Sequence, residues 1–277
     1  MRRRQFITFF GCAVALWPLP TRAQVQPSNE AIWQQFTEWL PGAPPVDAPT
    51  ELFNRYRSRL IANGASAAEA DQQLAIIRRL HHERPDAWRV MFNNIYKSDT
   101  PGFTTQPNAL LVAIIEDLRP GRALDIGMGQ GRNSVFLALK GWDVTGFDMS
   151  DEGIAIAQRN AARAGVKLSA MRETDEAFDY GADQWDLIAF MYEPFPITSA
   201  AYVDRLRKSL KPRGIIVIES FGEEAATPNQ PSTAIDPGRL LNAFHEFRLL
   251  RFEDTVALPD WGQTKRRLVR MVAEKRS

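Results

Sequence analysis

The residues best suited to chemistry in this 277-residue chain are three alternating glycines and the two acids that flank them. Gly127, Gly129 and Gly131 follow Asp125, and Asp148 ends the next apolar stretch. Glycine tolerates positive φ and lets a ligand approach the backbone without meeting a Cβ atom. An acid at the end of the second strand can accept hydrogen bonds from both hydroxyls of a ribose. The stretch therefore predicts a nucleoside-binding βαβ unit.

The spacing of the glycines distinguishes between nucleoside cofactors. A dinucleotide site needs G-x-G-x-x-G, with an open helix N-terminus facing a pyrophosphate. Here Gly131 comes one residue early, and Arg132 stands where that pattern needs Gly or Ala. The carboxylate of Asp125 would repel a diphosphate, whereas it could hold the ammonium of a methionine moiety near a sulfonium centre. The pattern favours a cationic adenosyl ligand; the alternative is a dinucleotide site or a purely structural turn.

The glycine motif, followed by the acid of the second strand, resembles that of class I S-adenosylmethionine-dependent methyltransferases. The longer string G-x-G-R-N-S-x-x-L-A-x-x-G-x-x-V-T is similar to the branch that includes tellurite-resistance and thiopurine-type small-molecule enzymes. The resemblance covers residues 96–277, with Met128 where the family often has Cys or Ser. It implies S-adenosyl-L-methionine as the cofactor and Thr174-Asp175 as the contact of the adenine amino group. The implied cofactor-binding residues are Asp125, Gly127, Gly129, Gly131, Arg132, Asn133, Asp148, Met149, Thr174 and Asp175.

Tyr192 and Glu193 are the candidate catalytic residues. They follow a nearly all-apolar stretch, residues 185–191, and so emerge at the carboxyl edge of the sheet, where ligands bind in open α/β folds. Methyl transfer from a sulfonium is an in-line displacement with a neutral leaving group, so placing the nucleophile is the main task. We expect Tyr192 to pack the substrate and Glu193 to take a proton or hold an amine. Two alternatives stay open: Glu193 pairs with a surface arginine, or a chalcogen or thiolate acceptor needs neither residue.

The resemblance also implies a lid over the methyl end of the cofactor, just before the first strand. Its candidate residues are Tyr96, Phe103, Gln106 and Asn108. The alternative is that the aromatic residues only pin this loop to the core.

The elements that must position these residues alternate between strand and helix from about residue 109 onwards. This order predicts an α/β fold: a Rossmann-like, doubly wound, mostly parallel seven-stranded sheet with helices on both faces. Strands are expected at 123–126, 143–147, 166–171, 185–191, 215–220, 247–257 and 266–273. Helices are expected at 109–118, 133–139, 150–165, 198–210 and 239–244.

Residues 24–95 precede this domain as a helical appendage, with helices predicted to begin near Ser28, Glu51 and Ser66. We expect it to be too small for a sizeable core of its own and to pack on the domain of residues 96–277. His81 and His82 end its third helix. Adjacent helical positions point about 100° apart and cannot easily share an ion, so a surface or interface role is expected and no metal site.

Residues 1–23 resemble a twin-arginine export signal. Arg2-Arg3-Arg4-Gln5-Phe6-Ile7 precedes a short apolar run, which is too short for a comfortable membrane span, and Ala23 offers a cleavage site. We therefore expect an exported, periplasmic protein with no stable membrane span after cleavage. An uncleaved anchor, or a misassigned start and a cytoplasmic protein, is the alternative.

The charge balance gives no reason to expect a nucleic-acid partner, because 34 basic residues face 33 acidic ones. Cleavage after Ala23 would remove four basic residues and no acids, which takes the net charge from +1 to −3. Cys12 is the single cysteine, so neither a disulfide nor a cysteine metal site is expected.

Three functions fit these observations to different degrees. The first is methyl transfer to a small-molecule acceptor. The second is a non-catalytic adenosyl-ligand-binding or sensor protein, and the third is an NAD(P)-dependent oxidoreductase, against which Asp125 and the early third glycine argue.

Overall fold

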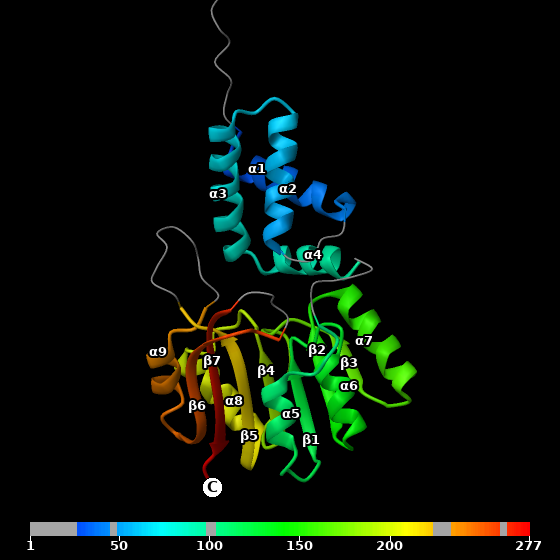
Figure 1. The fold of residues 1–277 in the computed structure, drawn as a ribbon, viewed down its shortest axis with the longest axis vertical. Helices are drawn as coiled ribbons and strands as arrows, with labels where there is room; N and C mark the ends of the chain where they lie inside the picture. The colour runs from blue at the N-terminus through cyan, green and yellow to red at the C-terminus, as the bar shows by residue number, and fades with distance from the viewer. Residues whose placement is uncertain (1–26, 45–48, 98–103, 224–233, 261–264) are drawn as a thin grey trace, which may run out of the picture.

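The computed structural model describes residues 27–44, 49–97, 104–223, 234–260 and 265–277 (Figure 1). The predicted export signal and the predicted lid residue Phe103 lie outside these ranges. Among the described residues, no helix is both long and apolar enough to cross a membrane.

A seven-stranded sheet forms the body of the molecule, with the order β3-β2-β1-β4-β5-β7-β6. Strands β1 to β5 are parallel, and β7 lies between β5 and β6 and runs antiparallel to both. This is the predicted seven-stranded, mostly parallel sheet. The strands are β1 (Arg122–Ile126), β2 (Asp143–Asp148), β3 (Ser169–Arg172), β4 (Trp185–Met191), β5 (Leu210–Phe221), β6 (Phe247–Ala257) and β7 (Arg266–Lys275).

Helices cover both faces of the sheet, because the central strands β1 and β4 are buried along nearly their whole length and successive side chains point to opposite faces. Leu124 and Phe190 belong to an apolar cluster with α8 (Ala200–Ser209) and α9 (Pro237–Ala243). The neighbouring residues Ala123 and Ala189 pack on the other face. That face carries α5 (Ala109–Ile115), α6 (Arg132–Leu139) and α7 (Asp151–Ala164).

Strand β5 begins earlier than the sequence predicts. The strand is expected over residues 215–220, yet it starts at Leu210, which pairs with Trp185 of β4. Regular pairing resumes only at Ile215 after a register shift, so Pro212 leaves no ladder hydrogen bond unmade. Arg213 has a φ of 64°, which marks the irregular stretch.

The helical appendage lies over the carboxyl ends of the parallel strands (Figure 1). It comprises α1 (Asn29–Trp39), the short 3₁₀ helix η1 (Leu40–Gly42), α2 (Pro49–Ala62), α3 (Ala67–Glu83) and α4 (Pro85–Tyr96). Helices begin at Ser28 and Ser66, as the sequence predicts. Ser28 caps α1, and Ser66 forms a capping box with Glu69 at α3. Contrary to expectation, the appendage has an apolar core of its own, which includes Phe36, Leu40, Leu52, Ile77, Met91 and Ile95.

His81 is buried in this core, so the expectation that it lies at the surface was wrong. Only 4% of the residue is exposed, and its ring packs edge-on against Trp88 with the centroids 4.2 Å apart. The imidazole ring thus packs among aromatic side chains of the appendage. The side chain of His82 lies outside the described part of the structure.

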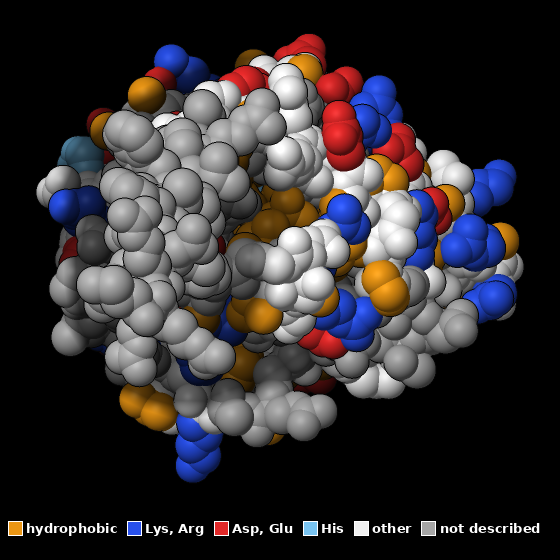
Figure 2. All heavy atoms as spheres, turned by 90° about the horizontal axis from the view of Figure 1, so that it is seen from above, with side chains coloured by type: hydrophobic (Ala, Val, Ile, Leu, Met, Phe, Trp, Pro, Cys, Tyr) orange, Lys and Arg blue, Asp and Glu red, His pale blue; other side chains and the backbone are white. Residues whose placement is uncertain are grey.

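Acidic and basic side chains are intermingled over much of the described surface seen in Figure 2. Near the centre of this view, apolar side chains lie in a hollow.

Candidate active site

The glycine turn between β1 and α6 places bare backbone against a cavity. Gly127 and Gly129 have φ values of 62° and 52°, which glycine tolerates best. A Cβ atom on Gly127 would lie 1.9 Å from the carboxyl carbon of Glu193, and one on Gly129 would lie 2.2 Å from the Tyr96 hydroxyl. Side chains from distant parts of the chain therefore come directly over these two glycines. Gly131 serves packing instead, since its Cβ would meet Ala157 of α7 at 2.8 Å.

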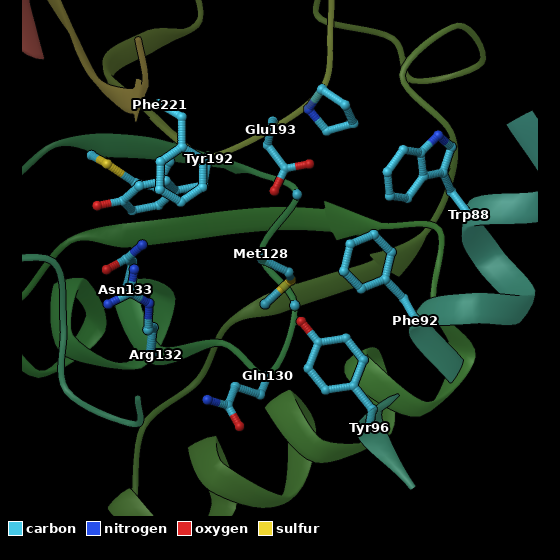
Figure 3. A pocket seen from close by; sticks show the side chains of 14 residues that line it. Trp88, Phe92, Tyr96, Met128, Gln130, Arg132, Asn133, Tyr192, Glu193 and Phe221 are labelled. Carbon is cyan, nitrogen blue, oxygen red and sulfur yellow. The ribbon is translucent and has the colours of Figure 1, made fainter. Parts of the chain in front are cut away.

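Two adjoining cavities lie over this turn. The larger has a volume of about 190 Å³, and the smaller one, of about 40 Å³, is bordered by Asp148, Met149 and Phe195. Both reach Gly127, Glu193 and the aromatic side chains of α4. The larger cavity is lined by Trp88, Phe92, Tyr96, Gly127, Met128, Gly129, Gln130, Arg132, Asn133, Met191, Tyr192, Glu193, Pro194 and Phe221 (Figure 3).

Asp148 lies at the end of β2, as predicted, and its carboxylate is held by backbone donors. The amide of Gly129 donates to one oxygen at 2.9 Å, and the amide of Ser150 donates to the other at 2.7 Å. Burial raises the pKa of Asp148 to about 6, although these two hydrogen bonds oppose the rise. The carboxylate is thus fixed at the border of the smaller cavity with lone pairs left for further donors.

Asp125 lies beneath the turn, 1% exposed, in β1. The Ser134 hydroxyl of α6 donates to it at 2.6 Å. Burial raises its pKa to about 6, a rise that the Ser134 hydrogen bond and the charge of Arg132 partly offset. Two buried acids at one turn make the site favour a cationic ligand.

Glu193 extends into the larger cavity, between two groups of aromatic side chains (Figure 3). No described residue donates a hydrogen bond to its carboxylate, so the predicted alternative, pairing with a surface arginine, is absent from the described part of the chain. Burial raises the pKa of Glu193 well above its ordinary value, and the charges of Asp148 and Asp125 raise it further.

Tyr192 also lines the cavity, from a strained backbone position. Its φ of 64° is rare for a bulky residue and marks a conformation that the surrounding structure must enforce. Its hydroxyl donates to Glu219 of β5, and its ring packs 5.1 Å from that of Phe221. Burial and the Glu219 charge raise the pKa of Tyr192, so its hydroxyl stays protonated at neutral pH.

Glu219 organises a second polar group beside the cavity. The sequence singled out two of its members, Asn108 and Arg132, but not Glu219, Asp260 or Arg270. Glu219 is fully buried, pairs with Arg270 of β7 and accepts from the Asn108 amide group at 3.0 Å. Asn108 also donates to Asp260, which pairs with Arg132 at 3.4 Å. The pKa of Asp260 is raised by burial and by the Glu219 charge. These residues come from four separate parts of the chain, and only the sheet order brings them together.

Helix α4 supplies one wall of the cavity, and of its residues the sequence predicted only the last, Tyr96, to belong to the site. Trp88, Phe92 and Tyr96 recur every four residues and stack on one face, with ring centroids 5.7 and 6.3 Å apart. A second series with the same spacing lies one position earlier and packs into the appendage core: Ala87, Met91 and Ile95. These two apolar series, each with i, i+4 spacing, are the pattern from which a helix with one face in a core and a second face on a cavity could have been predicted.

The other predicted residues have varied positions. Asn133 and Arg132 line the cavity, and the Gln106 carbonyl accepts from Arg132 at 2.9 Å. Thr174 accepts from the Ala177 amide at 3.3 Å. The carboxylate of Asp175 already accepts hydrogen bonds from Tyr180, Tyr202 and Arg205 at 2.6 to 2.7 Å. Its contact with an adenine stays a prediction. Among the described residues, no cluster of His, Cys, Asp or Glu could hold a metal ion.

Comparison with known proteins gives one family match and several similar proteins. Residues 123–214 match the family model described as a methyltransferase domain. Haemagglutinin 1 of Eikenella corrodens is 28% identical over 198 residues, which are 68% of this chain and 61% of that protein. The ubiquinone biosynthesis O-methyltransferase of Photobacterium profundum is 28% identical over 38% of this chain and 45% of that protein. The probable S-adenosyl-L-methionine-dependent methyltransferase TehB of Haemophilus influenzae is 35% identical over 24% of this chain and 23% of that protein.

One solved structure with this fold was determined with S-adenosylhomocysteine bound. The 1,6-didemethyltoxoflavin-N1-methyltransferase of Burkholderia thailandensis, determined with 1,6-didemethyltoxoflavin and S-adenosylhomocysteine, is 19% identical and superposes with a TM-score of 0.50 over 85% of this chain and 93% of that one. This likeness shows the fold. The chain spans less than two thirds of the length of the three curated relatives named above.

Proposed function

We propose that this chain, a class I S-adenosylmethionine-dependent methyltransferase, transfers a methyl group from that cofactor to a small-molecule acceptor in the cavity over the glycine turn. The observation that carries the proposal is the placement of Glu193 and Tyr96 over Gly127 and Gly129 at the carboxyl edge of the sheet. This is the position where open α/β folds bind ligands.

The residues present fit the cofactor. Glycines 127 and 129 leave backbone uncovered where a Cβ would fill the cavity. The two buried acids, Asp125 and Asp148, suit a ligand that carries positive charge and ribose hydroxyls. Asp148 would hold the ribose, Asp125 would favour the ammonium end, and the pair Thr174-Asp175 stays the proposed adenine contact.

When bound, the cofactor supplies an electrophilic methyl group on a sulfonium, with a neutral thioether as the leaving group. The chain's own task is placement and exclusion of water. Trp88, Phe92 and Tyr96 cover one side of the cavity, and Tyr192 and Phe221 form the other (Figure 3). We assign proton uptake from the acceptor to Glu193, because its carboxyl group extends into the cavity and accepts no hydrogen bond from a described residue.

A turnover assay tests the proposal. Purified protein is mixed with S-adenosylmethionine and a panel of thiols, phenols and amines, and S-adenosylhomocysteine is measured by mass spectrometry. We expect product that depends on the acceptor, and Asp148→Ala should lower kcat/KM at least about tenfold through lost ribose hydrogen bonds. Tight binding of S-adenosylhomocysteine without turnover on any acceptor would support a non-catalytic adenosyl-binding protein instead.

We also propose that residues 1–23 export the protein to the periplasm in the folded state. The twin-arginine pattern and the small residue at Ala23 support this. Sequencing the N-terminus of the protein recovered from the periplasmic fraction should give Gln24 first. Recovery of an intact N-terminus from the cytoplasm would contradict export.

A further inference from the structure

The two walls of the larger cavity are aromatic, and between them lies one carboxylate. Trp88, Phe92 and Tyr96 line one side, and Tyr192 and Phe221 line the other, with Glu193 between the two groups (Figure 3). Aromatic faces attract organic cations through the negative potential of their π systems, and they accept apolar or flat ligands as well.

The charges around the cavity are unbalanced. The cation that lines it among the described residues, Arg132, already pairs with Asp260 and donates to the Gln106 carbonyl. Arg270, which lies behind the wall, pairs with Glu219. The carboxylates of Asp125, Asp148 and Glu193 pair with none of the described basic side chains. S-adenosylmethionine carries a sulfonium, an ammonium and a carboxylate, so it brings one net positive charge to three acids. The site therefore favours a further positive charge or a proton at the Glu193 carboxyl group.

From this arrangement we propose, on the basis of the methyltransferase function proposed above, that the acceptor is an organic amine on an aromatic or apolar skeleton, with its nitrogen at the Glu193 carboxylate. The aromatic walls would hold the skeleton, and Glu193 would receive the N–H group. Acceptors that are anionic, such as carboxylates, phosphates or chalcogen oxyanions, would face Glu193 with Asp125 and Asp148 nearby and be repelled.

The step balances with the groups on hand. An amine that enters as an ammonium gives one proton to the Glu193 carboxylate and becomes neutral. Its nitrogen lone pair then forms a bond to the methyl carbon as the carbon–sulfur bond breaks, and that electron pair goes to sulfur. The product leaves as the N-methylated ammonium, and Glu193 returns its proton to solvent. No oxidant, reductant or metal is required.

Three probes of similar shape but different charge test this inference: benzylamine, benzyl alcohol and benzoate. Their dissociation constants are measured by isothermal titration on protein saturated with S-adenosylhomocysteine, which carries no sulfonium. We expect benzylamine to bind at least about tenfold more tightly than benzoate, a difference of about 1.4 kcal/mol, with benzyl alcohol between them. Benzoate binding as tightly as benzylamine, or more tightly, would overturn the proposal.

The Glu193→Gln variant removes the charge and keeps the shape. We expect it to lose the preference for benzylamine over benzyl alcohol, and the same preference in Glu193→Gln as in the native chain would also overturn the proposal. If this variant did not fold, the ranking of the three probes on the native chain would decide alone. Failure of S-adenosylhomocysteine itself to bind would count against the proposed function, whereas binding of that ligand with no preference for the amine would count against this inference alone.

Discussion

At the scale of single residues, the site depends on acids whose protonation is set by burial. Asp125 and Asp148 each have a pKa raised to about 6 from an ordinary value of 3.8. Between these two values the folded protein holds protons that the unfolded chain has released. The unliganded fold therefore loses stability as pH rises through this window. A cation or hydroxyl donor that binds the ionised carboxylates restores that lost stability.

This linkage predicts how ligand affinity depends on pH. Binding of S-adenosylhomocysteine should weaken as pH falls below about 6, because protons compete for the carboxylates that hold its ammonium and ribose. We expect its dissociation constant at pH 5 to be about tenfold higher than at pH 7.5 for each carboxylate that must ionise. Titration calorimetry at several pH values measures this, and Asp148→Asn should reduce the slope. An affinity that stays constant from pH 7.5 to 5 would show that neither acid binds the ligand in its ionised form.

The residues that could be predicted are those that lie close together in the sequence. The glycine turn, Asp125 and Asp148 belong to one βαβ unit, whose geometry follows from local rules. Glu219, Asp260 and Arg270 could not be assigned to the site, because they meet only after β7 inserts beside β5. Tyr192 and Glu193 could be placed at the sheet edge but not given partners.

At the scale of elements, α4 determines how the appendage meets the sheet domain. Its Asn94 side chain donates to the carbonyls of Leu40 and Ala43 in the appendage, at 3.4 and 2.8 Å. On the other side, Asn93 accepts from the Ser150 hydroxyl at 2.7 Å and from the Glu152 amide at 3.2 Å. These two donors lie at the N-terminus of α7, directly after the proposed ribose acid. The helix thereby connects the appendage to the cofactor site through defined hydrogen bonds.

Most elements could be predicted because their apolar spacing and caps agree, as at Ser28, Ser66 and Ser150. The role of α4 could not be predicted, because Arg89 and Asn93 find their partner, Asp151 of α7, only in the folded chain. The predicted start of β5 was wrong. Residues 211–214, Lys-Pro-Arg-Gly, have the composition that ends a helix, whereas pairing of Leu210 with β4 makes the strand begin before them.

At the scale of the whole molecule, the described part of the chain forms a helical layer with its own core, which lies over a sheet domain with cores on both faces. The cavity lies where these two parts meet, lined by α4 from above and by the strand ends from below (Figures 1 and 3). Sequence reasoning predicted the sheet and the presence of the appendage. It did not predict that the appendage has an apolar core of its own, nor that aromatic residues of its helix α4 line the cavity.

Thermal unfolding of residues 24–277 with and without S-adenosylhomocysteine, and with NADH as the control, tests the adenosyl-cofactor site most directly. Ligand at a hundred times its dissociation constant should add about 2.7 kcal/mol to the free energy of unfolding, which for a chain of this size corresponds to a rise in Tm of roughly 5–10 °C. We predict this rise with S-adenosylhomocysteine and none with NADH. A rise with NADH alone, or no rise with S-adenosylhomocysteine, would contradict the assignment of the glycine turn to an adenosyl cofactor.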